Sequence, residues 1–400
     1  MTSTATPNPA PRIRDPRLDF FRGVGMFIIL IAHITNNPWT LYIPARFGFS
    51  DATEMFVFCS GMASAIAFGA VFSRAGFWWG TVRILHRIWQ VYWVHVGVFL
   101  TTLALMVALN ASGVFPRDEV GALNLYPFLN SGGANVIGLL TLTYVPNYFD
   151  ILPMYLVILA MIPPMMALSR IDPMLPVIAS AGLWVAASFG GLNLPAELWF
   201  EPASARTWFF DPFAWQLVFF TGFALMSGWL PPPPVRPWLV WLAVGVVVLS
   251  VPFAWYKAIH ALNFVQEWRR DWSMLFDKSG FGILRYAHFL ALAYLAWVAV
   301  GPGGRRLSGG PVRTRVVRVI SGVGQQSLAV FATSMVLARV LGAFLHLWGY
   351  GPVVTLAVNL AGFAAIIGVA ALMGVIKRQP WNVARSTSPV PDAVPAGVRT

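Results

Sequence analysis

Cysteine and charged residues are both scarce in this chain of 400 residues. The single cysteine, Cys59, excludes an internal disulfide and a metal cluster held by several cysteines. Charged residues make up 10% of the chain, hydrophobic residues make up 58%, and the mean hydropathy is +0.68. Soluble globular domains carry far more charge than this. The composition therefore predicts a protein that crosses a membrane several times, and we expect neither a metal site nor a tightly bound cofactor.

The net charge of +12 does not indicate a nucleic-acid partner. The basic residues form no single patch but are spread over short segments between apolar runs, as the positive-inside rule expects for a membrane protein. The first 17 residues lead directly into an apolar segment without a small-residue cleavage site, so we expect no signal peptide and a retained first helix. The Pro-rich tails, 1–16 and 379–400, are predicted to be disordered and cytoplasmic.

The region 17–378 is predicted to be one transmembrane domain, an all-α bundle of about ten helices. Most of the 27 Lys and Arg residues fall on one side if both termini are cytoplasmic. The segment 134–148 is too short to cross and is interpreted as re-entrant or interfacial, although an additional span there would invert everything after it. The predicted spans are 18–36, 51–72, 82–109, 149–168, 174–190, 209–228, 236–256, 281–300, 319–347 and 351–376.

The first predicted span, which begins RLDFFRG, contains polar residues that share one helical face. At about 100° per residue, Asp19, Arg22, His33 and Asn37 lie within about 60° of one another. Titratable groups inside a membrane are costly and usually face a functional cavity. The alternative is that Asp19 and Arg22 form an interfacial pair at the helix start while His33 bonds a neighbouring helix. We take His33 as the candidate general base.

The second span opens with SDATEMFVFCSG, and its Glu54 starts near the depth of His33. A carboxylate beside a buried imidazole fixes its tautomer and raises its basicity, so Glu54 is the second catalytic candidate. The alternative for Glu54 is an acid at the helix N-terminus, and for Asp51 a cap. Small residues on the same face, Gly61 among them, indicate a closely packed neighbour, for which the first helix is the natural candidate.

The third span begins TVRILHRIWQ, with Arg83 and Arg87 on one face and His86 flanking it. Arginines at this spacing bind phosphate well, but they also serve as positive-inside anchors at the lipid headgroups. Further polar residues are expected to face the bundle interior, where bonds between helices are an alternative to substrate binding. These are Asp150, Tyr155, Asp211, Gln216, Asp277, Lys278, Arg285 and His288, of which Asp150, Tyr155, Gln216 and Arg285 are taken as candidate binding residues.

With these motifs in view, the chain resembles the OpgC family of the acyltransferase-3 group over nearly its whole length. The motifs are RLDFFRG…H (17–33), DATEMFVFCSG (51–61), RILHRIWQVYW (83–93), YFDILPMY (148–155), PFAWQLVFFTG (212–222), DKSGFGILRYAHFLALAYL (277–295) and GQQSLAVF (324–331).

The resemblance implies a bacterial inner-membrane enzyme that moves a succinyl group from cytoplasmic acyl-CoA to periplasmic glucans. It places the catalytic histidine on His33, the acid on Glu54 and the basic pair on Arg83 and Arg87. Phe58-Cys59 replaces a common valine and leucine, which concerns packing and not the proposed chemistry.

On this interpretation Arg83 and Arg87 hold the CoA phosphates, His33 is oriented by Glu54, and Asp19 and Arg22 shape the lower cavity. Asn37 and Gln216 are candidate oxyanion donors. Acetyl-CoA as donor to another exported polysaccharide remains an alternative, as does a transporter or flippase that uses the same charges. Neither the acyl group, the acceptor nor the oligomeric state follows from the sequence.

Overall fold

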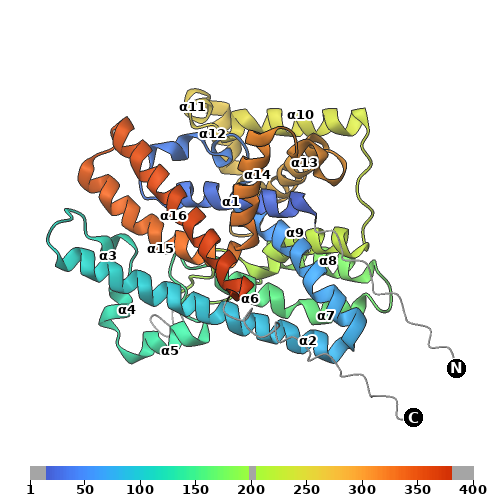
Figure 1. Ribbon diagram of the computed structural model, residues 1–400, viewed down its shortest axis with the longest axis horizontal. Helices are drawn as coiled ribbons and strands as arrows, with labels where there is room; N and C mark the ends of the chain where they lie inside the picture. Colours follow the sequence, from blue (N-terminus) through green and yellow to red (C-terminus); the bar gives the residue numbers. More distant parts are fainter. Residues whose placement is uncertain (1–14, 198–203, 381–400) are drawn as a thin grey trace, which may run out of the picture.

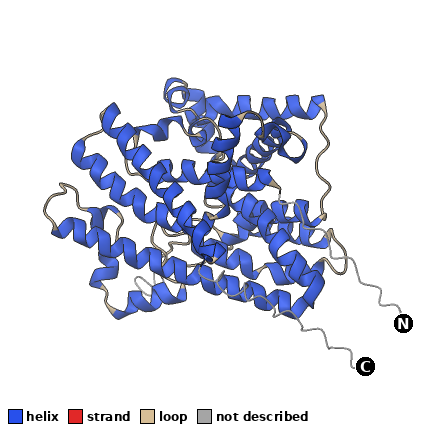
Figure 2. Cartoon of the chain, viewed as in Figure 1, coloured by secondary structure: helices blue, strands red, loops and turns tan. Residues whose placement is uncertain are grey.

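The computed structural model describes residues 15–197 and 204–380, and within these ranges the chain is a bundle of helices without a β-strand (Figures 1 and 2). The predicted tails fall outside the described residues except for 15–16 and 379–380. The longer helices are α1 (Pro16–His33), α2 (Ala52–Ala111), α6 (Ile151–Ala160), α7 (Ile162–Leu168), α8 (Leu175–Gly190), α9 (Pro212–Ser227), α10 (Pro237–Ala254), α13 (Ile283–Val300), α14 (Pro311–Gln325), α15 (Ser327–Trp348) and α16 (Pro352–Arg378).

Short helices occupy the connections. They are η1 (Pro38–Tyr42), η2 (Pro44–Arg46), α3 (Glu119–Ala122), α4 (Tyr126–Asn130), α5 (Gly133–Thr141), α11 (Tyr256–Ala261), α12 (Asn263–Asp271), η3 (Ser273–Leu275) and η4 (Pro302–Leu307). The ambiguous segment 134–148 contains the nine-residue α5, followed by extended chain. Nine helical residues rise about 14 Å, which is half the hydrocarbon core, so α5 does not cross it.

Helix α2 contains 60 residues and would be about 90 Å long if it were straight, three times the hydrocarbon core. It is not straight, because Gly76 has φ 83° and ψ 177°, a conformation essentially restricted to glycine. Figure 1 shows the two halves running in different directions. Gly76 therefore joins two helices, which match the spans predicted at 51–72 and 82–109.

Six helices of the described chain are long and apolar enough to cross a membrane: α2, the α6–α7 segment (Ile151–Leu168), α10, α13, α15 and α16. Helices α8 and α9 are apolar but have 16 residues each. Helix α1 carries three charged residues, Arg17, Asp19 and Arg22, and is not among the six. The helical membrane architecture is confirmed, while the count of ten spans and the cytoplasmic position of both ends stay predictions.

Helix α2 packs against α9 at a crossing of two glycines. A Cβ atom on Gly61 would collide with the carbonyl of Phe219, and one on Gly222 would collide with the carbonyl of Phe58. Close approach of this kind suits a membrane, where helix association depends on packing more than on the hydrophobic effect. The small-residue face of the second span was predicted to meet the first helix, but at Gly61 it meets α9.

Helix α1 makes the corresponding approach to α14, through Gly23 and Gly324. A Cβ atom on Gly324 would collide with the carbonyl of Asp19, and one on Gly23 with the carbonyl of Ile320. Helix α15 also packs on α1 and α2, so the C-terminal end of α1 is held between two elements distant in sequence. This packing fixes the position of His33, the last residue of α1.

Candidate active site

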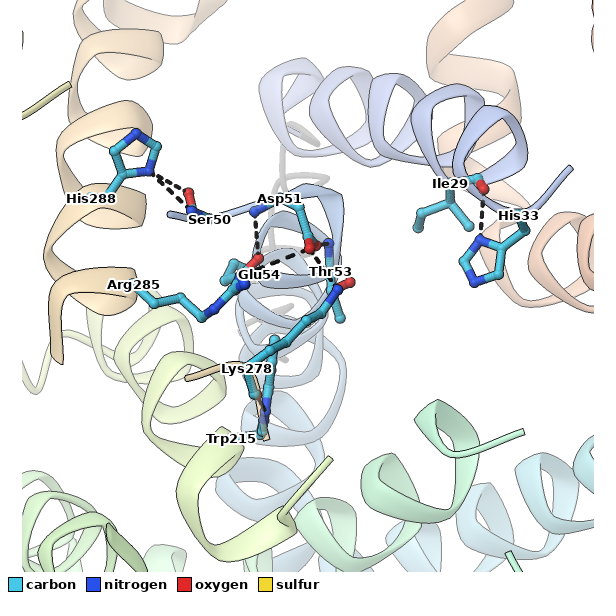
Figure 3. Close-up of polar contacts among 10 residues, drawn as sticks. All are labelled: Ile29, His33, Ser50, Asp51, Thr53, Glu54, Trp215, Lys278, Arg285 and His288. Carbon is cyan, nitrogen blue, oxygen red and sulfur yellow. Dashed lines mark hydrogen bonds and ion pairs between the residues drawn. The ribbon is translucent and has the colours of Figure 1, made fainter. Parts of the chain in front are cut away.

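Four charged side chains gather where α2 begins. This charge cluster consists of Asp51, Glu54, Lys278 and Arg285 (Figure 3). Lys278 Nζ lies 2.6 Å from Asp51 Oδ2, and Arg285 Nη1 lies 2.6 Å from Glu54 Oε1 and 3.8 Å from Asp51 Oδ2. Two acids and two bases balance in charge, which buried ions require. The cluster ties α2 to α13 and to the loop before α13.

The start of α2 explains why the two acids lie together. Asp51 is the residue before α2, and its side chain accepts from Thr53 N–H, while the Glu54 carboxylate accepts from Asp51 N–H at 2.7 Å. These reciprocal bonds form a capping box. Burial raises the pKa of the Asp51 carboxyl, but Lys278 and Arg285 outweigh burial and hold this pKa well below its usual range.

The structure does not join Glu54 to His33 as the sequence predicted. Both Glu54 oxygens are engaged, one by Arg285 and one by the Asp51 backbone, and His33 Nδ1 lies 2.7 Å from the carbonyl of Ile29 (Figure 3). The physical reason is the capping box, which turns the Glu54 carboxylate back toward its own helix start, where Arg285 neutralises it. Glu54 therefore supports the fold around the site, and its orienting role passes to Ile29.

The contact with Ile29 fixes the tautomer of His33. A carbonyl oxygen only accepts, so Nδ1 carries the hydrogen and Nε2 of the neutral ring keeps its lone pair. An imidazole with a free Nε2 lone pair and a fixed ring is suited to remove a proton. The base that the sequence predicted is thus prepared by its own helix.

His33 lies where two cavities adjoin. The first, of about 320 Å³, is lined by Asp150, Lys278 and Thr53 as well as apolar side chains, and the second, of about 480 Å³, is lined by Arg339 and Arg46. Both linings include His33 and Tyr148. One imidazole therefore borders two separate spaces, an arrangement that suits a reaction between two molecules.

Tyr148 lines both cavities and has a strained backbone. Its ring makes an edge contact with the His33 ring at 5.4 Å, and its hydroxyl donates to the carbonyl of Met335 at 2.5 Å. Its φ is 88°, a value rarely adopted by a bulky side chain. Strain of this kind costs about 1–3 kcal/mol and is concentrated at functional sites. The packing of α15 on the tyrosine hydroxyl holds this conformation.

Asp150 contributes a buried carboxylate to the first cavity. It directly precedes α6, its side chain is 4% exposed, and its Oδ1 has no hydrogen-bond partner among the described residues. Burial raises the pKa of this carboxyl to about 7. An acceptor atom in this position suits a hydroxyl group of a ligand, and Asp150 is one of the residues that the sequence predicted to bind substrate.

The predicted phosphate-binding residues lie on the surface of α2. Arg83 and His86 are exposed and Arg87 is partly exposed, with Arg87 Nη1 donating to Gln90 at 3.3 Å and Gln90 bonded to His86. Neither of the two cavities is lined by these residues. Their role in binding CoA stays a prediction.

Two other predicted site residues, Gln216 and Asn37, form hydrogen bonds to neighbouring segments of the bundle. Gln216 accepts from the Ser180 hydroxyl and donates to the carbonyls of Ser180 and Phe213, which occupies both of its amide hydrogens. Asn37 exchanges hydrogen bonds with Asn359 and donates its second amide hydrogen to the carbonyl of Ile31. In this arrangement neither amide has a hydrogen left for an oxyanion.

The remaining predicted residues also lie away from the two cavities. Arg22 donates to the hydroxyl of Ser327 on α15, and Asp19 is buried on α1. The Tyr155 ring contacts the Phe219 ring of α9 at 6.1 Å. None of these three lines either cavity.

Tyr148 and Arg339 were not predicted as site residues, while Lys278 and His288 were expected to face the bundle interior without a site role. Arg339 and His288 lie within apolar helices, where a titratable residue indicates a functional or pairing role, so that rule could have selected them. His288 Nδ1 accepts from Ser50 N–H at 3.3 Å and lies 2.7 Å from its hydroxyl, which joins α13 to the residue before Asp51. Tyr148 and Lys278 lie in loops, where helical periodicity gives no contact partner, so the sequence did not show that both line a cavity with His33.

The fold and the site together describe a helical membrane protein with a partly buried histidine that lines two cavities. A family model described as OpgC protein matches residues 14–378. The chain belongs to this OpgC family, and membership implies a membrane protein of the acyltransferase type. Neither the curated proteins nor the solved structures include a match to the chain.

Proposed function

We propose that the protein transfers an acyl group, succinyl in the first instance, from cytoplasmic acyl-CoA to hydroxyl groups of periplasmic glucans across a bacterial inner membrane. Membership of the OpgC family supports the acyltransferase class. The single observation that carries the mechanism is His33, which has a fixed tautomer and borders both cavities. One cavity receives the acceptor hydroxyl and the other receives the acyl group.

The reaction needs one base and no cofactor. His33 Nε2 takes the proton of an acceptor hydroxyl while its oxygen attacks the thioester carbonyl carbon. A carbon–oxygen bond forms, the carbon–sulfur bond breaks, and the CoA thiolate takes the proton from His33 and leaves as the free thiol. An ester and CoA result, and the imidazole returns to its starting form.

The first cavity suits the acceptor. Its lining includes Asp150, whose buried and unpartnered Oδ1 would accept a hydrogen bond from a sugar hydroxyl that displaces its covering groups, and aromatic residues such as Phe209 and Phe210, on which a sugar ring packs. Lys278, which is paired with Asp51, lines the same cavity and contributes positive potential next to the acceptor. A preorganised positive group is worth more in such an enclosed site than in water.

The test is acyl transfer by the purified protein in lipid nanodiscs, with a neutral glucan as acceptor. His33→Gln should lower the rate about 10²- to 10⁴-fold, the usual contribution of a general base, while the protein remains assembled. His260→Gln, on the exposed short helix α11, is the matched control and should leave the rate unchanged.

Both products are measured, the acylated glucan by mass spectrometry and the CoA thiol by a colorimetric reagent. Succinyl-CoA and acetyl-CoA are compared as donors, since an acetyl preference would favour the second acyl group. A transporter would release no thiol. Normal turnover of His33→Gln would refute the assignment of the base.

A further inference from the structure

The second cavity is electropositive, unlike the first. The charged residues in its lining are Arg46 and Arg339, and the described lining contains no acid. The first cavity instead carries one acid, Asp150, and one base, Lys278. Two guanidinium groups around a space of about 480 Å³ favour an anionic ligand.

Arg339, a residue of the cavity lining, has one nitrogen without any partner among the described residues. It lies on α15, is 6% exposed, and uses Nη1 to donate to Thr35 Oγ1 at 2.7 Å. Its Nη2 forms an ion pair with Glu119 Oε2 at 3.5 Å, whereas its buried Nε has no partner in the described part of the chain. A buried charged donor without a partner is costly. Nε therefore has a hydrogen to donate to a ligand carboxylate, a charge-assisted bond of the kind that arginine makes.

The position of Arg339 relative to His33 limits the length of the ligand. The Arg339 guanidinium lies 5.4 Å from the centre of the Tyr148 ring, and the His33 ring lies 5.4 Å from the same centre. The two groups are therefore separated by no more than twice that distance. A four-carbon diacid measures about 4 Å between its terminal carbons, and it fits within this limit with a hydrogen-bond length at each end.

We propose that Arg339 is the specificity-determining residue of the acyl donor site and binds the far carboxylate of a dicarboxylic acyl group in the second cavity. This inference rests on the proposed function, because it takes His33 as the base that acts on the same acyl group. Arg46, exposed at the mouth of the cavity, draws the anion in. A neutral acyl chain of the same length gains nothing from either arginine.

The experiment compares two donors of equal carbon number, succinyl-CoA and butyryl-CoA, with one neutral glucan acceptor in nanodiscs. The wild-type protein should prefer succinyl-CoA in kcat/KM. Arg339→Met, which keeps the length of the side chain, should lower kcat/KM for succinyl-CoA by about 10- to 100-fold, the value of a charge-assisted hydrogen bond. The value for butyryl-CoA should change by less than about threefold. Arg270→Met, on the exposed face of α12, is the matched control and should change neither.

Two further measurements keep the proposal testable if Arg339→Met does not fold. Free succinate should inhibit the wild-type protein more strongly than free butyrate, and Arg46→Gln should weaken that inhibition. Glu119→Gln removes the one carboxylate near Arg339 and should preserve the succinyl preference.

The outcomes separate this inference from the proposed function. A wild-type protein that transfers no acyl group from either donor refutes the proposed function. Transfer without a succinyl preference, equal losses with both donors in Arg339→Met, or equal inhibition by succinate and butyrate would each overturn the role of Arg339 while leaving acyl transfer in place.

Discussion

Removing Arg285 alone should destabilise the protein severely, because it leaves a carboxylate buried without its partner. Glu54 is 0% exposed, and Arg285 Nη1 is the one cation within 2.6 Å of it among the described residues. Lys278 does not replace the lost charge, since it is bound to Asp51. In Arg285→Met the Glu54 carboxylate would keep only the Asp51 N–H. Breaking a buried pair in this way costs about 3–5 kcal/mol.

A second substitution should restore most of that stability. In Glu54→Gln/Arg285→Met both buried charges are gone, and the glutamine oxygen still accepts from Asp51 N–H, so the capping box is kept. Replacement of a buried ion pair by neutral residues is often close to neutral in stability. We expect the free energy of unfolding of the double variant to lie within about 2 kcal/mol of the wild-type value and above that of Arg285→Met.

The assay is unfolding in mixed detergent and SDS micelles, followed by the fluorescence of the 18 tryptophans. The control is the exposed pair Arg270–Asp271, whose side chains are 74% and 57% exposed. Arg270→Met should cost no more than about 1 kcal/mol. The reasoning fails if Arg285→Met costs no more than the control, or if the double variant is as unstable as the two single losses added together.

Three further predictions concern the α1–α14 contact, the pH dependence of stability, and the break in helix α2 at Gly76. Gly324→Ala places a methyl group on the carbonyl of Asp19 and should lower the stability by about 1–3 kcal/mol in the same assay. The control Gly97→Ala, on helix α2, meets open space and should raise the stability by up to about 1 kcal/mol. Equal effects of the two substitutions would contradict the close α1–α14 contact. Because burial raises the pKa of Asp150 from 3.8 to about 7, the wild type should lose stability relative to Asp150→Asn as the pH rises through this range and keep a constant difference above it; parallel pH profiles would contradict this. Gly76→Ala forces a side chain into a conformation with φ 83° and should cost at least about 1 kcal/mol of stability, although the added methyl group would touch no other residue. An unchanged unfolding midpoint would show that the break in α2 does not need glycine.

The helices of this protein could be predicted from its sequence because apolar length is a local property. Most predicted spans coincide with one helix in the structure, and the segment 134–148 holds most of the short helix α5. The span predicted at 319–347 was wrong at its start, because its first residues belong to α14, a separate helix that ends at Gln325 before α15 begins at Ser327. The division of α2 into two helices was predicted as well, since one predicted span ends at 72 and the next begins at 82. The turn itself depends on Gly76, whose backbone angles no apolar pattern shows.

The partners of the polar residues could not be predicted, because helical periodicity gives a face and not a neighbour. Glu54 was matched to His33 by depth and face, yet its partner is Arg285, 231 residues later. A capping box was visible in the sequence as Asp51 followed three residues later by Glu54, and it would have shown where that carboxylate turns. His33 was identified correctly as lying beside a cavity, whereas its bond to Ile29 belongs to its own helix and was not considered.

The wide sequence separation within the charge cluster has a consequence for biosynthesis. Glu54 and Arg285 are 231 residues apart, and Asp51 and Lys278 are 227 apart. At a synthesis rate of about 5–20 residues per second, the acids leave the ribosome roughly 10 to 50 seconds before the bases. During that interval the N-terminal half of α2 carries acids without the countercharges that neutralise them in the folded protein. We expect this half of α2 to reach its final depth in the bilayer only when α13 arrives, so that the last third of the chain completes the insertion of the first.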